Sequence, residues 1–228
     1  MQPLIPPPPP SPPVPTGRAY AGKSAAERQS ERRERLMAAG QMLFATLGLE
    51  ATTMREVSAR ARVRLDQAQE LFGSKTGLFI EVHKALSAEL HDAMVASLPP
   101  DTRPDLRRLV RTLIVTGLEH LRADPAKARI LVGETSQLQW HATAHLQTYL
   151  EQAAVLLRAR CAERFPRASG AVDIEVTLAG LLGYIVSAGR CWMNRGFDLS
   201  AQELADQCLL PILGLLMWLE AKEVSAAA

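Results

Sequence analysis

Four helices in quick succession are predicted over residues 35–86, and this series constrains the fold more than any other part of the chain. Apolar residues recur at three- and four-residue spacing in the first helix and therefore share one face: Leu36, Ala39, Leu43, Phe44 and Leu47. Gly48 directly after them is a natural C-cap. Thr53 and Glu56 fit a capping box, which predicts that a second, short helix begins there.

A third helix, also short, is predicted from about residue 65 to residue 72, after a turn at residues 62–64. Its packed face consists of Leu65, Ala68, Leu71 and Phe72. Ser74 and Lys75 then open a longer fourth helix. Three short helices behind a basic arm form a helix-turn-helix headpiece, whose last short helix usually reads the DNA major groove. The sequence therefore predicts a helix-turn-helix over about residues 53–72.

The same segment resembles the tetracycline-repressor (TetR) family of bacterial transcription regulators over roughly residues 33–86. The residues that carry the resemblance are Ala38-Ala39, Leu43-Phe44, Gly48, Thr52-Thr53, Val57, Ala61, Val63 and Phe72-x-Ser74-Lys75-x-x-Leu78. The resemblance implies an all-α fold, in which a three-helix headpiece precedes a C-terminal helical bundle for ligand binding and dimerisation. It also implies a repressor that a small-molecule effector releases from its DNA operator.

This chain departs from the family pattern in the turn and in the reading helix. The family usually has Gly, Ser and Gly where this chain has Arg62, Arg64 and Asp66, and Leu-Tyr-x-His at residues 68–71, which are Ala-Gln-Glu-Leu here. Asp66 and Glu70 add negative charge to the helix that would enter the groove. They motivate an alternative: a TetR-like helical dimer with a degenerate headpiece, which acts through a protein or small-molecule partner without specific DNA binding.

Glutamines and basic side chains of the headpiece are the predicted DNA contacts. Gln67 and Gln69 can read adenine, and Arg64 and Lys75 can hold backbone phosphates. The whole predicted set is Thr53, Arg62, Arg64, Leu65, Gln67, Gln69 and Lys75. The positive charge lies in this part of the chain, because residues 18–84 hold twelve Lys/Arg against eight Asp/Glu, whereas residues 85–228 hold fourteen against sixteen. Glutamates interleave with the arginines of the first helix, so a solvated helix with i,i+4 ion pairs explains that stretch nearly as well.

Three segments are predicted along the chain. Residues 1–24 form a disordered proline-rich arm, since nine of the first fifteen residues are prolines. A docking segment for a proline-reading partner is the alternative for this arm. Residues 25–85 form the DNA-binding domain, and residues 86–228 form the effector-binding and dimerisation domain. Neither a signal peptide nor an apolar run of about 18 residues is found, so a cytoplasmic protein without membrane contact is expected.

The C-terminal half is predicted to contain five helices, at about residues 105–121, 124–131, 142–164, 173–194 and 200–221, with a kink at Pro211. The last two are apolar nearly all round, as VTLAGLLGYIVSAG and CLLPILGLLMWL show. A helix without a polar face needs cover on all sides, and Gly180, Gly183 and Gly189 permit another helix to approach closely. A homodimer through these two helices is therefore expected, with a larger monomeric core as the alternative.

An effector pocket is expected between the middle helices of this bundle. The candidate residues are His120, Trp140, His141, His145, Tyr149, Tyr184 and Trp192. His141 and His145 have the spacing of two metal ligands, but no third ligand follows in register, so no metal and no cofactor are expected. The chain lacks a glycine-rich phosphate loop and a G-x-S-x-G elbow, which argues against an enzyme. Three cysteines in apolar contexts, Cys161, Cys191 and Cys208, are expected as reduced core thiols.

Overall fold

The computed structural model describes residues 24–98, 105–133, 155 and 158–226, and within these ranges the chain is helical and contains no strand. The first four helices are α1 (Ala25–Ala51), α2 (Met54–Ala61), α3 (Leu65–Phe72) and α4 (Lys75–Ala96). They are followed by α5 (Leu106–Ala123), α6 (Pro125–Val132), a helical segment at residues 158–164, the short 3-10 helix η1 (Ser169–Ala171), α8 (Ile174–Asn194), α9 (Ala201–Cys208) and α10 (Leu210–Ser225). The predicted all-α class is thereby confirmed.

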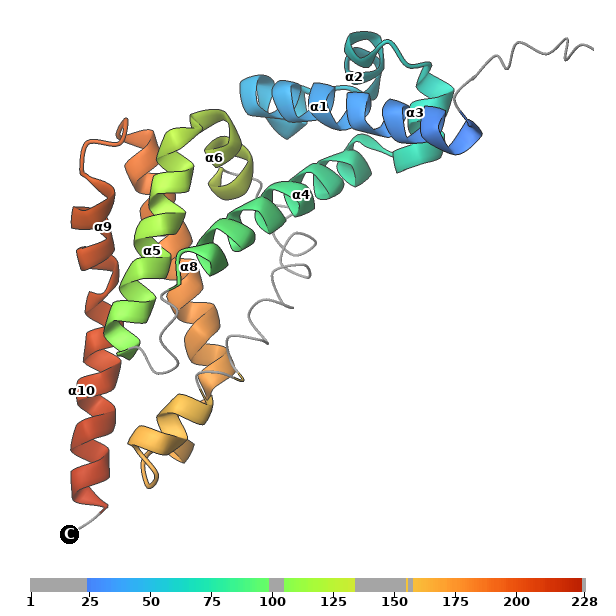
Figure 1. The fold of residues 1–228 in the computed structure, drawn as a ribbon. Coiled ribbons are helices and arrows are strands. Elements are labelled where there is room, and N and C mark those ends of the chain that lie inside the picture. The colour runs from blue at the N-terminus through green and yellow to red at the C-terminus, as the bar shows by residue number, and fades with distance from the viewer. Residues whose placement is uncertain (1–23, 99–104, 134–154, 156–157, 227–228) are drawn as a thin grey trace, which may run out of the picture.

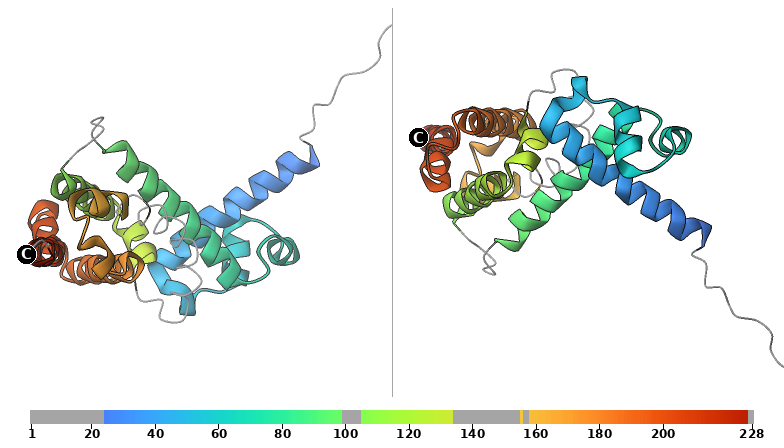
Figure 2. Two further views of the ribbon diagram at one scale, coloured as in Figure 1. Left: turned by 90° about the horizontal axis from the view of Figure 1, so that it is seen from below. Right: turned by 90° about the horizontal axis from the view of Figure 1, so that it is seen from above.

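The helices gather into two bodies that α4 connects, as the views in Figures 1 and 2 show. The headpiece consists of α1–α3 and the start of α4, and the bundle consists of α5, α6 and α8–α10. The predicted domain boundary at residue 85 falls inside α4, which is continuous from Lys75 to Ala96. Leu86 still packs in the headpiece, whereas Met94 lies 3.8 Å from the position of a Cβ at Gly117 of α5. The helix α4 is therefore one of the links between the two bodies.

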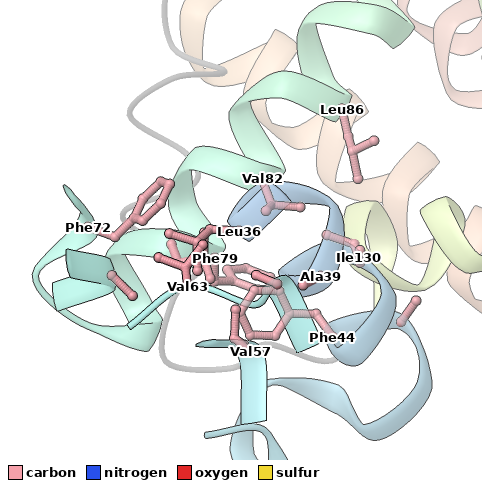
Figure 3. Close-up of a cluster of buried hydrophobic side chains, with 14 residues drawn as sticks. Leu36, Ala39, Phe44, Val57, Val63, Phe72, Phe79, Val82, Leu86 and Ile130 are labelled. Carbon is pink, nitrogen blue, oxygen red and sulfur yellow. The ribbon is translucent and has the colours of Figure 1, made fainter. Parts of the chain in front are cut away.

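The headpiece has one apolar core, to which all four of its helices contribute (Figure 3). Its most deeply buried side chains are Leu36 of α1, Val57 of α2, and Leu78, Phe79 and Val82 of α4. The Phe79 ring meets the ring of Phe44 edge to face, with centroids 5.2 Å apart. Ile130 reaches into this core from α6. The two bodies thus share one hydrophobic cluster.

Local signals explain where the headpiece helices begin and end. The capping box of Thr53 and Glu56 is confirmed: the Thr53 hydroxyl accepts from the Glu56 N–H, and the Glu56 carboxylate accepts from the Thr53 N–H. Gly48 has φ +80° and breaks the regular part of α1, as its position after the last apolar repeat predicts. The buried Thr52 hydroxyl donates to the Gly48 carbonyl oxygen at 2.7 Å. These hydrogen bonds fix the corner between α1 and α2.

The bundle is held by smaller apolar clusters. The largest joins α5, α8 and α9, with Leu118, Trp192, Leu204 and Cys208 among its buried members. The prediction of a single helix over residues 200–221 is wrong in one respect, because the structure divides this stretch at Leu209 into α9 and α10. Pro211 lies in the first turn of α10, where its missing N–H interrupts the helical hydrogen bonding less than it would in mid-helix.

One face of α8 and one face of α10 are apolar and exposed. The exposed positions of these faces include Val176, Gly180, Gly183 and Tyr184 on α8, and Leu210, Gly214, Met217 and Trp218 on α10. A Cβ added at any of the three glycines would meet no atom within 4 Å. Among the described residues, the stretches Ile174–Asn194 and Ala201–Ser225 are long and apolar enough to cross a membrane by length and composition alone. Core helices of proteins that never enter a membrane satisfy the same criterion.

The three cysteines occupy two kinds of environment. Cys161 and Cys208 are buried and free, as predicted, and burial raises the pKa of both thiols. The prediction was wrong for Cys191, which is exposed. The reason is its register on α8: it follows Tyr184 by seven residues, or two helical turns, and so shares the outer face of that helix.

Candidate nucleic-acid interface and ligand cavities

The turn between α2 and α3 depends on an arginine in a left-handed conformation. Arg62 has φ 52° and ψ 45°, and its N–H donates to the carbonyl oxygens of Ala59 and Ser58. The next N–H, that of Val63, donates to the Ser58 carbonyl oxygen at 3.0 Å, and the Val63 side chain enters the core. The turn therefore closes α2 and leaves the Arg62 side chain exposed. The glycine common in the family at this position adopts such a φ without the steric cost of a Cβ.

The amphipathic face predicted for α3 is confirmed in outline. Ala68 and Phe72 are buried, and Leu65 is half-buried. Gln69 and Glu70 are exposed. The helix thus packs on one side and presents amides and carboxylates to the outside, where a base edge can be approached.

Arg64 and Asp66 form a bidentate ion pair at the start of α3. The Arg64 Nε and Nη2 atoms lie 3.1 and 2.7 Å from the two carboxylate oxygens of Asp66. The side chain of Arg64 makes no cap, and Asp66 instead accepts from the N–H of Gln67 at 3.0 Å. The hydrogen bonds from Arg64 lower the pKa of the Asp66 carboxyl below its ordinary value. Arg64 can therefore offer the Nε–Nη2 edge of its guanidinium to a phosphate only by leaving Asp66.

Two other residues predicted to contact DNA have partners inside the headpiece. The Lys75 ammonium donates to the carbonyl oxygens of Leu49 and Glu50, each at 2.9 Å, and so stabilises the negative end of α1. The Thr53 hydroxyl is part of the capping box of α2 and donates to the Glu56 carboxylate at 2.8 Å. An ammonium has three donors, so Lys75 retains one for another acceptor.

Exposed basic side chains also lie on α2 and in the turn that follows it. Arg62 was predicted from the sequence as a DNA contact, whereas Arg55 and Arg60 were not, and none of the three side chains has a hydrogen-bond or ion-pair partner within the described part of the chain. The sequence did contain a signal for Arg60 as a candidate contact, because it belongs to a cluster of basic residues at the end of a short helix. Arg33 has a structural role instead, because it pairs with Glu81 and lies over the Phe72 ring, with Cζ 4.9 Å from the ring centroid.

Four of the seven candidate effector residues, Trp140, His141, His145 and Tyr149, lie outside the described residues. The other three are not brought together. Trp192 is a core residue: its Nε1–H donates to the Leu199 carbonyl oxygen at 3.0 Å, and its ring packs against Phe197. Tyr184 lies on the exposed face of α8, with 42% of its surface accessible.

His120 lies apart from both Trp192 and Tyr184, at the junction of α4, α5 and α6. Its Nε2 atom is buried and lies 3.9 Å from a carboxylate oxygen of Glu89, which also pairs with Lys127 at 2.5 Å. Within the described ranges, no group of three or more His, Cys, Asp or Glu side chains is placed to hold a metal ion.

An apolar cavity of about 190 Å³ lies between α5, α8 and α10, and we call it the bundle cavity. Its walls include Leu106, Val110, Leu178, Leu182, Ile212 and Leu216. Leucine and isoleucine also fill ordinary cores, so no sequence pattern distinguished these wall residues from core residues. The bundle cavity is smaller than the roughly 300–1,000 Å³ of typical ligand pockets.

A second cavity, of about 420 Å³, lies where the end of α1 meets α6 and the end of α8, and we call it the joint cavity. Two arginines line it, Arg129 of α6 and Arg190 of α8. The sequence held a signal for the second, since Arg190 is the only charged residue between Glu175 and Arg195 in an otherwise apolar helix.

The comparisons with solved structures bear on the fold. No protein-family model and no curated protein sequence matches the chain. The fatty acid degradation regulator FadR from Bacillus halodurans has a TM-score of 0.64 at 15% identity, over 78% of this chain and 92% of its own. FadR from Bacillus subtilis, solved in complex with stearoyl-CoA, has a TM-score of 0.61 at 14% identity, over 77% and 95% of the two chains.

A third structure extends the likeness beyond the FadR proteins. A TetR-family transcription regulator from Shewanella sp. PV-4 has a TM-score of 0.62 at 20% identity, over 78% of this chain and 94% of its own. Each alignment spans nearly the whole of the known regulator, so both the headpiece and the bundle are matched. The chain therefore has the all-helical fold of the TetR-family transcriptional regulators.

Proposed function

We propose that the chain is a cytoplasmic, homodimeric DNA-binding regulator that reads the major groove with α3. One observation carries the proposal: α3 exposes Gln69, and the end of α2 and the turn before α3 expose Arg60 and Arg62, which have no partner within the described residues. Basic side chains with no internal counter-ion are available to phosphates, and amides can read base edges. The TetR-family fold supports this proposal, because the last short helix of a helix-turn-helix usually reads the major groove, and α3 is that helix in this chain.

Asp66 is the feature that most affects how tightly this surface can bind. It holds Arg64 by two hydrogen bonds and adds a negative charge next to Gln67. We infer that DNA binding separates this pair, with Arg64 turning to a phosphate and Asp66 left near the bases. A carboxylate there favours a cytosine amino group over any acceptor. The site preference therefore differs from that of relatives with a glycine at this position.

Capture of tagged protein on native chromatin, followed by fluorescence anisotropy with the best captured duplex and a random duplex, tests the function. Asp66→Asn is expected to tighten the complex with the random duplex by up to about tenfold, because Arg64 no longer has to leave an ion pair, and to reduce the preference for cytosine in the captured duplex. Gln67→Ala is expected to relax preference at one base position by about 1–3 kcal/mol. Glu163→Gln, which removes the same charge from the bundle surface, is the matched control and should change nothing.

Failure of every captured duplex to exceed random DNA at moderate salt would instead support the alternative function. In that case the chain is a TetR-like dimer that acts through a protein or small-molecule partner. The acidic residues Asp66 and Glu70 on α3 favour this second candidate.

We propose further that the regulator is a repressor whose effector places an apolar group in the bundle cavity. Its walls come from α5, α8 and α10, and α5 packs against α4. A ligand that shifts α5 moves α4 and changes the spacing of two headpieces in a dimer. The ligand can change the equilibrium between two headpiece spacings only by as much as it prefers one spacing over the other. We expect this coupling free energy to be about 1–3 kcal/mol, and DNA should weaken ligand binding by the same factor by which the ligand weakens DNA binding. The relation to FadR, solved with stearoyl-CoA, makes acyl chains the first class to test.

Stearoyl-CoA, octanoyl-CoA and free CoA can be titrated into the preformed DNA complex. Release by the acylated forms and not by CoA is the expected result. Leu178→Phe should reduce the effect by filling the bundle cavity, while Val224→Phe, at an exposed position outside that cavity, serves as the control. Acyl-CoA binding that leaves DNA affinity unchanged would contradict the coupling but not the DNA binding itself.

The homodimer is proposed to form through the exposed faces of α8 and α10. Gly180 and Gly183 of α8 leave open space above the helix, as does Gly214 of α10, so a second copy can approach closely. Met217 and Trp218 add large apolar surface beside them. An apolar patch of this kind on an otherwise polar protein marks an interaction site, and two-fold pairing would present two α3 helices to the two halves of a near-palindromic site.

A further inference from the structure

The joint cavity differs from the bundle cavity in charge. It is bordered by the end of α1, by α6 and by the last turn of α8, and none of the described residues that line it is acidic. Arg129 donates one hydrogen bond to another described residue, from Nη1 to the Ala45 carbonyl oxygen at 3.3 Å. Arg190 is half-buried, and its guanidinium has no hydrogen-bond or ion-pair partner within the described part of the chain. Over the described ranges the cavity therefore holds two positive charges and no negative side chain.

A half-buried guanidinium without a counter-ion is an unfavourable arrangement unless something else compensates it. Each guanidinium has five N–H donors, and toward the described residues Arg129 uses one of them and Arg190 none. Removing a charge from water costs free energy, and a bound carboxylate or phosphate returns it through short, charge-assisted hydrogen bonds. Lys75, which also lies near the end of α1, differs from these two arginines because its ammonium already donates to two backbone carbonyl oxygens.

The remaining walls of the joint cavity define the rest of the ligand. Phe44, Leu47, Phe79, Ile130 and Met193 supply apolar surface. The polar groups are few: Thr46 donates its hydroxyl to the carbonyl oxygens of α1, and Asn194 adds an amide. The volume of about 420 Å³ lies within the range of small-molecule sites.

We propose that the joint cavity binds a small organic anion, in which a carboxylate or phosphate lies between Arg129 and Arg190 and an apolar body lies against Phe44 and Met193. The site is separate from the bundle cavity and does not depend on the proposed DNA binding. Because its walls come from α1 on one side and from α6 and α8 on the other, its occupant contacts the headpiece and the bundle at once. The ligand thus fixes the angle between them.

Isothermal titration of the full chain with 1-naphthyl phosphate, 1-naphthol and inorganic phosphate tests the proposal. The phosphate ester combines both parts of the expected ligand, and each of the other two compounds has only one. We expect 1-naphthyl phosphate to bind at least about tenfold more tightly than either. Arg190→Gln and Arg129→Gln should each weaken it about tenfold or more, while Arg122→Gln, an exposed arginine elsewhere on α5, should not.

Two further variants separate loss of the site from loss of the fold. Arg190→Lys keeps the charge and should retain part of the affinity, and Met193→Trp should abolish binding by filling the cavity with both arginines in place. Circular dichroism and thermal unfolding report whether each variant is folded. Equal binding of 1-naphthol and its phosphate ester, or affinity unchanged in folded Arg190→Gln, would overturn the proposal. Binding of inorganic phosphate as tight as that of the ester would overturn the part played by the apolar walls.

Discussion

The headpiece buries its apolar residues within one chain, whereas the bundle leaves many of its own exposed. Among the described residues, ten large apolar side chains are exposed, and seven of them lie at residue 155 or later. The headpiece core in contrast includes side chains from every one of its helices, and Leu36, Val57 and Leu78 have no exposed surface at all. The difference indicates that the headpiece has a complete hydrophobic core within a single chain, whereas the bundle does not.

A complete core and an incomplete one have different uses. The proposed reading of base edges requires a headpiece of fixed shape, because the side chains that read must be held in place. The exposed faces of α8 and α10 are the proposed contact for a second copy, and the bundle cavity and the joint cavity are the proposed ligand sites. Four changes, taken from the largest expected effect to the smallest, break or sharpen this contrast.

The first change places a charge on the exposed face of the bundle. Gly183→Glu fits the single chain, because a Cβ there meets no atom within 4 Å. In a dimer the carboxylate would be buried without a partner, so we expect the dimer dissociation constant to rise at least about a hundredfold. Light scattering at micromolar protein measures the mass, and Ala38→Glu, exposed on α1, is the control. A monomer mass for the unaltered protein would refute the dimer.

The second change compares one substitution in the two bodies. Leu78→Ala removes a fully buried side chain from the headpiece core and should cost about 2–5 kcal/mol of unfolding free energy. Leu182→Ala removes a half-buried side chain that already borders the bundle cavity, so about 1–2 kcal/mol is expected. Urea unfolding of both variants at one protein concentration gives the two values. Equal losses would show that the bundle is packed as completely as the headpiece.

The third change relieves the one strained turn of the headpiece. Arg62→Gly places glycine at φ 52° and should stabilise the fold by about 0.5–1 kcal/mol. Arg60→Gly is the matched control, because the same exchange in the last turn of α2 should destabilise by a similar amount. Thermal unfolding of the pair checks the opposite signs. A shift of the same sign in both would mean that charge, and not backbone conformation, determines the result.

The fourth change concerns acid stability. Hydrogen bonds from Thr53 lower the pKa of Glu56 in the folded chain, so its contribution is present above the ordinary glutamate pKa and is lost as pH falls through the lowered value. Glu56→Gln keeps an oxygen that can accept from the Thr53 N–H but does not titrate. The melting temperature should therefore fall less steeply with acid in this variant, in scans from about pH 6 to pH 3. Glu70→Gln, outside any capping box, should leave the slope unchanged.

Features determined by neighbouring residues could be predicted from the sequence. The limits of α3, the corner at Gly48 and the capping box of Thr53 and Glu56 follow from contacts within a few residues, and the structure has all of them. The partners of long side chains could not be predicted in this way. Lys75 binds carbonyl oxygens 25 and 26 residues away, and Arg33 pairs with Glu81, 48 residues away.

The packing of the bundle was harder to predict, because the sequence of a helix that is apolar on all sides does not indicate which face packs inside the bundle. Leu182, for example, faces the bundle cavity, whereas the next residue, Gly183, faces outward. The joint cavity has a similar origin. Arg129 and Arg190 are 61 positions apart and converge only because α6 and α8 pack together at the end of α1. Spacing along the chain cannot reveal such a pair.

Ile130 has a consequence for anyone who wishes to exchange headpieces between regulators of this fold. Its side chain belongs to the headpiece core although α6 belongs to the bundle, and the adjacent Arg129 donates to the Ala45 carbonyl oxygen of α1. A fragment cut at the end of α4 would leave a hole where Ile130 was. A working chimera must therefore carry α6 with its headpiece or refit residue 130 to the new core, and the linear order of the gene is a poor guide to the unit that can be transplanted.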